Sequence, residues 1–207
     1  MGTTEQWAMA HGISVAETPP AIPDFSEPWP HPARHVAERA VILQGIVAVG
    51  YGVEPGPVTA WLQEQGIWER VSPGEMAFLL DPSPTDEERN RFRWHQEAER
   101  TLLWAIGKVE ALGLPTRGCD TRRLVDEIIP PLGSEVEGFL ASAELRSPGV
   151  LLAEDDRTYE LWCRAVAARR EGEPLPQDLN WLVLYERRYA FEWLGGPREW
   201  DEITCDA

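Results

Sequence analysis

The sequence predicts an all-α fold, a single compact domain of about eight helices that follows an extended N-terminal arm. Apolar residues recur at helical spacing in every segment after residue 33, helix-start signals separate these segments, and no stretch alternates like a half-buried strand. With 207 residues, 43% of them hydrophobic, the chain can bury a core of its own. We interpret the ten tryptophans as residues of helix-packing seams rather than of a ligand groove.

Residues 1–33 are expected to form a short helix followed by a proline-rich arm. The stretch PPAIPDFSEPWPHP, residues 19–32, contains six prolines. Because proline lacks a backbone N–H and fixes φ, neither a helix nor a central strand tolerates that density. We therefore predict an extended arm here and a helical domain over residues 34–207.

The first half of the helical domain has four predicted helix signals. RHVAERAVILQGIVAVG (34–50) is apolar on nearly all sides in its second half, which predicts a central, buried helix. PVTAWLQEQG (57–66) predicts a short helix. The capping-box patterns SPGE (72–75) and TDEE (85–88) each predict a helix start. The second box should open the longest helix, whose apolar stripe runs to Leu112.

The second half completes the predicted fold. Asp120 is expected to cap a short helix, and SEVE (134–137) gives a third capping box. Two long helices follow, in residues 150–172 and 178–196. The acidic residues 154–156 are expected in the first turn of their helix, where the helix dipole stabilises anions.

The chain is strongly acidic. Nineteen Lys and Arg residues against 35 Asp and Glu residues give a formal net charge of −16. An acidic surface repels phosphate backbones and anionic lipids, so we expect neither a nucleic-acid nor a membrane partner. The same surface attracts a basic protein, although solubility alone is an alternative explanation of the charge.

Cysteine usage and the N-terminal sequence favour the cytoplasm. Cys119, Cys163 and Cys205 are odd in number and widely spaced, which argues against a disulfide framework. The start MGTTEQWAMAHG has neither the basic nor the apolar region of a signal peptide. The longest apolar stretch, residues 40–53, is too short to span a bilayer.

None of the common catalytic or cofactor motifs occurs in the sequence. It has no H-E-x-x-H zinc motif, no phosphate-binding glycine loop and no G-x-S-x-G nucleophile. We therefore expect no metal and no cofactor. His95 and Glu99 lie one helical turn apart, and we interpret them as an exposed helix pair rather than as ligands.

Five segments carry a family resemblance: VAERAVILQGIVAVGYG (36–52), SPGEMAFLL (72–80), WHQEAERTLLWAIGKVEALGLPTRGCD (94–120), YERRYAFEWL (185–194) and WDEITCD (200–206). By order and spacing they resemble a bacterial family known as domain of unknown function 4272. The resemblance implies an all-helical intracellular domain and carries no established activity. The matching polar positions are Arg39, Glu75, Glu97, Asp120, Glu186, Arg187, Asp201 and Asp206. The family pattern has other residues where this chain has His95, Arg188 and Glu192.

These matching positions support two hypotheses for a site. In the first, the C-terminal tail folds back with Trp200 as a plug, and its acids meet Arg39 or Arg187, because buried charges must be paired. This structural ion-pair network comprises Arg39, Glu97, Glu186, Arg187, Asp201 and Asp206. In the alternative, Arg39 and Arg187 bind a carboxylate or phosphate, with Glu97 as general base and Glu186 as the second candidate catalytic residue.

The leading functional hypothesis is a non-enzymatic cytoplasmic helical domain that acts by binding another protein, and its acidity favours a basic partner. One alternative is an enzyme or small-molecule binder with a polar Arg/Glu pocket between the first, long and last helices. Another alternative is a structural subunit of an oligomer, for which an exposed apolar patch would be the sign.

Overall fold

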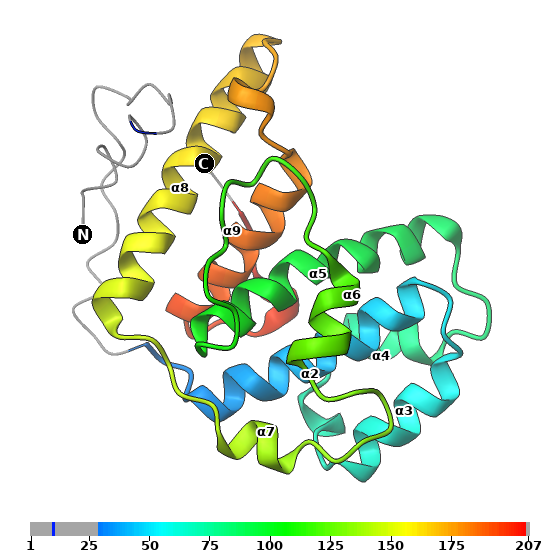
Figure 1. The fold of residues 1–207 in the computed structure, drawn as a ribbon. Coiled ribbons are helices and arrows are strands. Elements are labelled where there is room, and N and C mark those ends of the chain that lie inside the picture. Colours follow the sequence, from blue (N-terminus) through cyan, green and yellow to red (C-terminus); the bar gives the residue numbers. More distant parts are fainter. Residues whose placement is uncertain (1–9, 11–28, 206–207) are drawn as a thin grey trace.

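The computed structural model describes residue 10 and residues 29–205 (Figure 1). In this part of the chain eight α-helices, α2 to α9, are joined by turns and short helical segments, and no β-strand occurs there. The predicted all-α fold is therefore confirmed. The predicted N-terminal helix and most of the proline-rich arm fall in residues 1–9 and 11–28, outside the described residues.

The centre of the fold is the pair formed by α2 (Ala33–Gly50) and α5 (Asp86–Ala105), which pack against each other (Figure 1). All residues of α2 from 36 to 47 are buried, as its apolar run predicts. Gly50 lets the two backbones approach, because a Cβ added there would lie 3.1 Å from the carbonyl oxygen of Arg89.

Four of the other helices are short: α3 (Pro55–Glu64), α4 (Pro73–Leu80), α6 (Thr121–Arg123) and α7 (Glu137–Ala141). Of these, α3, α4 and α7 pack against α2. Four further helical segments are single turns: η1 (Trp68–Arg70), the π-helical η2 (Leu124–Ile128), η3 (Pro176–Asp178) and η4 (Trp200–Glu202).

Side-chain caps fix three of the helix starts as the sequence predicts. Ser72 and Thr85 cap α4 and α5 with reciprocal capping boxes, and Asp120 caps α6. The capping box predicted at residues 134–137, before α7, does not form. The hydroxyl of Ser134 donates to the carbonyl oxygen of Pro131 instead, and α7 begins without a side-chain cap.

The helix predicted to run to Leu112 ends earlier than expected. α5 stops at Ala105, and Gly107 follows with a φ of 74°, the left-handed conformation that ends many helices. Nε of Arg146 donates to the carbonyl oxygen of Trp104 at 2.7 Å, so a distant side chain satisfies the helix end. With 20 residues, α5 is therefore shorter than α8, which has 24.

The last two long helices are α8 (Pro148–Glu171) and α9 (Trp181–Gly195). α9 packs against both α5 and α8 (Figure 1). Because α8 begins at Pro148, the acidic residues 154–156 lie beyond its first turn. The prediction that the helix dipole stabilises them there is therefore wrong. Asp155 is neutralised instead by Arg188 of α9, whose Nη1 lies 2.5 Å from Oδ1.

Two hydrophobic clusters hold the helices together. The main cluster includes side chains of α2, α3, α5 and the C-terminal half of α9. The smaller one lies between α8 and α9 and consists of Leu161, Trp162, Ala165, Leu179 and Leu184. The tryptophans with buried side chains are Trp61, Trp104, Trp162, Trp193 and Trp200. Over the described ranges, no helix combines the length and hydrophobicity that a bilayer crossing requires.

Candidate functional site

The first buried ion pair joins α2 to α4. Arg39 and Glu75 are 3% and 1% exposed, and Nη2 of Arg39 donates to Oε2 of Glu75 at 2.5 Å. The same carboxylate oxygen accepts the backbone N–H of Ser72 at 3.0 Å, which fixes its orientation. The guanidinium centre also lies 4.7 Å above the ring of Trp200, a cation–π contact.

The tail after α9 folds back onto the start of α4. Asp201 accepts the hydroxyl of Ser72 at 2.6 Å and the backbone N–H of Gly74 at 2.7 Å. Its carboxylate therefore supplies a second cap for α4, where the helix dipole stabilises an anion. Tyr189 on α9 donates its hydroxyl to the carbonyl oxygen of Trp200 and holds the tail in place.

A second buried pair joins α5 to α9. Nε of Arg187 lies 3.8 Å from Oε2 of Glu97, and its two Nη atoms donate to the carbonyl oxygens of Leu112 and Gly113 at 3.0 Å and 2.8 Å. Oε1 of Glu97 accepts the backbone N–H of Cys119. Burial lowers the pKa of Arg187 to about 10, so it remains a cation at neutral pH. The pair braces the loop after α5.

The third contact is between Glu186 and His95, whose Nδ1 lies 2.8 Å from Oε2 of the carboxylate. Burial opposes protonation of His95, but the carboxylates of Glu186 and Glu75 raise its pKa overall. The expected exposed pair of His95 and Glu99 is therefore wrong. Glu99 is 1% exposed, and burial raises its pKa to about 8.

The candidate residues thus form pairs that share no hydrogen bond, although Glu75 and Arg39 act electrostatically on His95. Arg39 pairs with Glu75, Arg187 with Glu97, and Glu186 with His95. Asp201 binds the start of α4 instead of an arginine. Asp206 lies outside the described residues. Glu97, Glu186 and Arg187 do not line the cavity that Arg39 lines, so the four do not form a common pocket.

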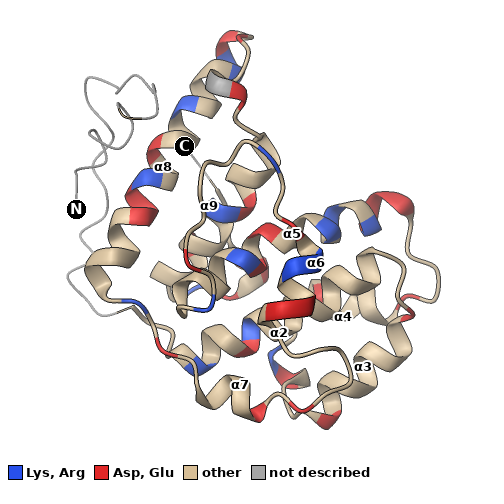
Figure 2. Ribbon diagram, viewed as in Figure 1, with Lys and Arg blue, Asp and Glu red and all other residues tan. Residues whose placement is uncertain are grey.

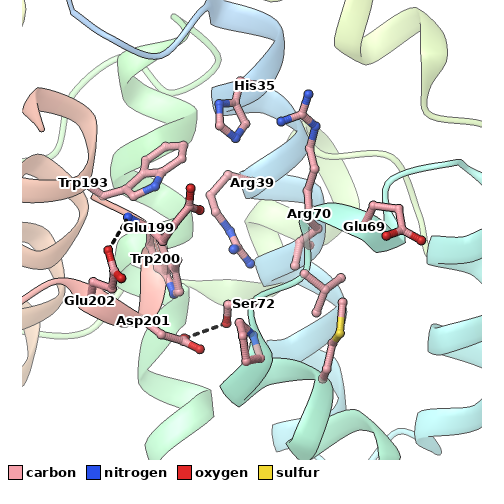
Figure 3. A pocket seen from close by; sticks show the side chains of 14 residues that line it. His35, Arg39, Glu69, Arg70, Ser72, Trp193, Glu199, Trp200, Asp201 and Glu202 are labelled. Carbon is pink, nitrogen blue, oxygen red and sulfur yellow. Dashed lines mark hydrogen bonds between the residues drawn. The ribbon is translucent and has the colours of Figure 1, made fainter. Parts of the chain in front are cut away.

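This cavity, of about 450 Å³, lies between α2, the start of α4, α9 and η4 (Figure 3). Its charged and histidine lining residues are His35, Arg39, Glu69, Arg70, Glu199, Asp201 and Glu202. Trp193 and Trp200 add aromatic surface. Figure 3 shows His35, Arg39 and Arg70 close to one another, with the side chain of Glu69 directed away from them. We call the region bounded by these three basic residues the inner end.

A hydrogen-bonded pair, His31 and His35, determines which ring nitrogen of His35 carries a proton at the inner end. Nε2 of His31 lies 3.1 Å from the carbonyl oxygen of Gly196, so it must carry a proton and donate. Nδ1 of a neutral His31 is then an acceptor, and Nδ1 of His35, 3.2 Å away, must be the donor. Nε2 of His35 is consequently a bare acceptor. Burial, together with His31, Arg70 and Arg39, lowers the pKa of His35 to about 4.

Most carboxylates of the cavity already have partners in the protein. Glu199 and Glu202 form a reciprocal capping box around η4, and Asp201 caps α4. Arg39 is paired with Glu75, and Nε of Arg70 lies 2.7 Å from Oε2 of Glu38. Each arginine still has N–H groups that donate to no described residue, since no other hydrogen bond involves them.

A second hollow, of about 930 Å³, lies along the loop after α5. Three of its four cations, Arg100, Lys108 and Arg123, are bound within the protein, and the fourth, Arg117, is exposed. Lys108 donates to the hydroxyl and carbonyl oxygens of Ser142, and Arg100 donates to the carbonyl oxygen of Ala111.

Sequence reasoning identified Arg39, Trp200 and Asp201 but missed the other residues of this cavity. His35, Arg70 and Trp193 reach it from three different elements. A signal for one of them was available, because His31 and His35 stand four residues apart at the start of a helix. Nothing local marks Arg70, whose place at the cavity follows only from the packing of η1 beside α2.

The fold and the cavity together define an all-α domain with buried ion pairs and a polar hollow that its tail helps to close. The chain belongs to the family described as domain of unknown function (DUF4272), whose model matches residues 2–203. The family resemblance seen in the sequence is confirmed by this match. No curated protein and no solved structure matches the chain. In the described part of the chain, no three His, Cys, Asp or Glu side chains are grouped so that they could hold a metal ion.

Proposed function

We propose that this domain is a non-enzymatic binding module that recognises a basic protein partner at the mouth of the Arg39 cavity. The observation that carries the proposal is the set of exposed carboxylates there. Glu69, Glu199, Asp201 and Glu202 are all exposed and line one cavity of a chain with a net charge of −16. Such a rim attracts lysine and arginine side chains and accelerates their association.

The internal contacts support binding rather than catalysis. Glu97 and Glu186, the candidate catalytic residues, are buried against Arg187 and His95. A general base must reach a substrate proton, and neither carboxylate lines the cavity. The charged groups of the helix seam therefore serve to orient α5 and α9.

We also propose that the domain works in the cytoplasm. Cys119 and Cys163 are free thiols. Burial and the carboxylate of Glu97 raise the pKa of the Cys119 thiol well above its usual range. Free thiols are typical of reducing compartments.

The oligomer-subunit hypothesis has less support from the surface. The exposed large apolar residues are Tyr51, Val53, Leu80, Leu114, Val125 and Leu182. Only these six large apolar side chains of the described residues are exposed, whereas an obligate interface needs a large contiguous apolar patch.

A charge-removal experiment tests the proposed function. The variant with Glu69→Gln, Glu199→Gln and Glu202→Gln loses three rim charges but keeps the acceptors that cap η4. A matched control carries Glu54→Gln, Glu64→Gln and Glu87→Gln, three exposed positions that do not line the cavity. Binding of a labelled hexapeptide that alternates glycine and lysine is measured by fluorescence anisotropy at low and moderate salt.

The rim variant should bind the peptide several-fold more weakly than the control variant does, and added salt should weaken binding by the wild type. Equal weakening in both variants would show that only the global charge acts. That result, or a lack of salt-sensitive binding, would contradict the proposed site.

A further inference from the structure

We propose that the inner end of the cavity binds the C-terminal carboxylate of the basic partner chain. The inference rests on the proposed function and names the group that the partner inserts. The partner's lysine or arginine side chains then meet the acidic rim, while its terminal carboxylate reaches Arg39 and Arg70.

Two arginines with unused donors line the inner end, and Figure 3 shows the guanidinium group of Arg70 beside His35 and that of Arg39 near Trp200 and Ser72. Arg39 gives one Nη to Glu75, and its Nε is buried without a partner. Arg70 uses Nε for Glu38, and its side chain is 50% exposed, so its Nη atoms can turn toward a ligand. Planar guanidinium donors fit the two oxygens of a carboxylate better than any other side chain does.

The histidine pair distinguishes a chain terminus from a simple anion. Nε2 of His35 is a bare acceptor, because His31 fixes the proton on Nδ1. A fully deprotonated anion such as sulfate has no hydrogen to donate to it, whereas hydrogen phosphate does, so phosphate is disfavoured by charge alone. The last residue of a peptide presents a carboxylate with its own backbone N–H close by, so it supplies both an acceptor for the arginines and a donor for His35.

The charges around the inner end favour a basic chain over a free dianion. The rim carboxylates of Glu199, Asp201 and Glu202 would repel a phosphate. A peptide end that carries lysine or arginine is complementary to both parts of the cavity. The volume of about 450 Å³ admits only a small group, such as the last one or two residues of a chain.

The experiment compares the labelled glycine–lysine hexapeptide in its free-acid and C-terminally amidated forms, with the full chain at pH 7.5. The free acid should bind at least about tenfold more tightly, because amidation removes the charge that the two arginines contact. In the variant Arg70→Ala this difference should shrink, while the affinity for the amide stays close to that of the wild type.

Arg123→Ala is the matched control, since Arg123 is likewise exposed and paired with one glutamate. It should leave the preference for the free acid unchanged. Circular dichroism checks that both variants keep their helix content.

Each outcome separates this inference from the proposed function. Equal binding of the two peptide forms, with salt sensitivity retained, would overturn the carboxylate site but not the basic partner. Loss of binding by both forms would overturn the proposed function. Displacement of the labelled free-acid peptide by free arginine as effectively as by the unlabelled peptide would assign the carboxylate site to a single amino acid and overturn the chain terminus as its occupant.

Discussion

Glu99 carries a carboxyl group that is buried on α5, and its Oε1 has no hydrogen-bond partner. His95 and Glu97 of the same helix, by contrast, are paired with Glu186 and Arg187 of α9. Burial raises the pKa of Glu99 from its ordinary 4.5 to about 8, so the folded protein holds it protonated at neutral pH. Its pKa therefore links folding to pH.

The variant Glu99→Gln should be stabilised relative to the wild type as pH rises. Between pH 4.5 and about 8 the folded state binds a proton at Glu99 that the unfolded chain has lost, so stability falls with increasing pH. Glutamine does not titrate, so the variant escapes this loss. Its free energy of unfolding relative to that of the wild type should be about 3 kcal/mol higher at pH 8 than at pH 5. Urea unfolding at the two pH values measures it. A stability difference between variant and wild type that is the same at both would refute the assignment.

At the scale of elements, His31 attaches residues 29–32 to α9. Its ring stacks on Trp193 with centroids 4.0 Å apart and donates to the carbonyl oxygen of Gly196. Burial lowers the pKa of His31 despite its backbone contacts and the nearby Glu199. The junction between the arm and α2 therefore requires two neutral imidazoles.

The double variant His31→Asn and His35→Gln should flatten the acid side of the stability profile. From pH 6.5 down to about 4, the unfolded chain binds a proton at His35 that the folded chain excludes, so wild-type stability falls with falling pH. Thermal unfolding between these pH values, compared with the wild type, reveals the contribution. A variant whose stability falls just as steeply would show that other groups cause the loss.

The sequence allowed prediction of elements with local signals. Ser72, Thr85 and Asp120 act on backbone N–H groups within three residues, so their caps could be read directly. The early end of α5 could not, because Arg146 contacts it from 42 positions along the chain. The partner of Asp201 was missed for the same reason, since a charge in a sequence carries no information about which distant group it meets.

At the scale of the whole molecule, the unbalanced charge opposes folding. Acidic and basic positions are spread over the ribbon rather than separated into two halves (Figure 2). The excess of acids therefore repels itself over most of the surface, and the unfolded chain relieves that repulsion by expanding. The fold must offset it through apolar burial and internal pairing.

Added salt should therefore stabilise this protein. Raising sodium chloride from about 20 mM to about 300 mM shortens the Debye length and screens the repulsion, so Tm should rise by a few degrees. Differential scanning fluorimetry measures the shift, and an uncharged osmolyte of equal osmolality serves as the control. A Tm that falls with salt would indicate that attractive surface pairs dominate instead.

The hydrogen bond between Ser72 and Asp201 joins positions 129 residues apart. During synthesis, α2 and α4 leave the ribosome long before residue 201 does. Until then the ring of Trp200 is missing from beneath Arg39, and the first turn of α4 lacks one of its acceptors. The nascent chain therefore keeps an unfinished core through most of its translation, and chaperones can bind it throughout that interval.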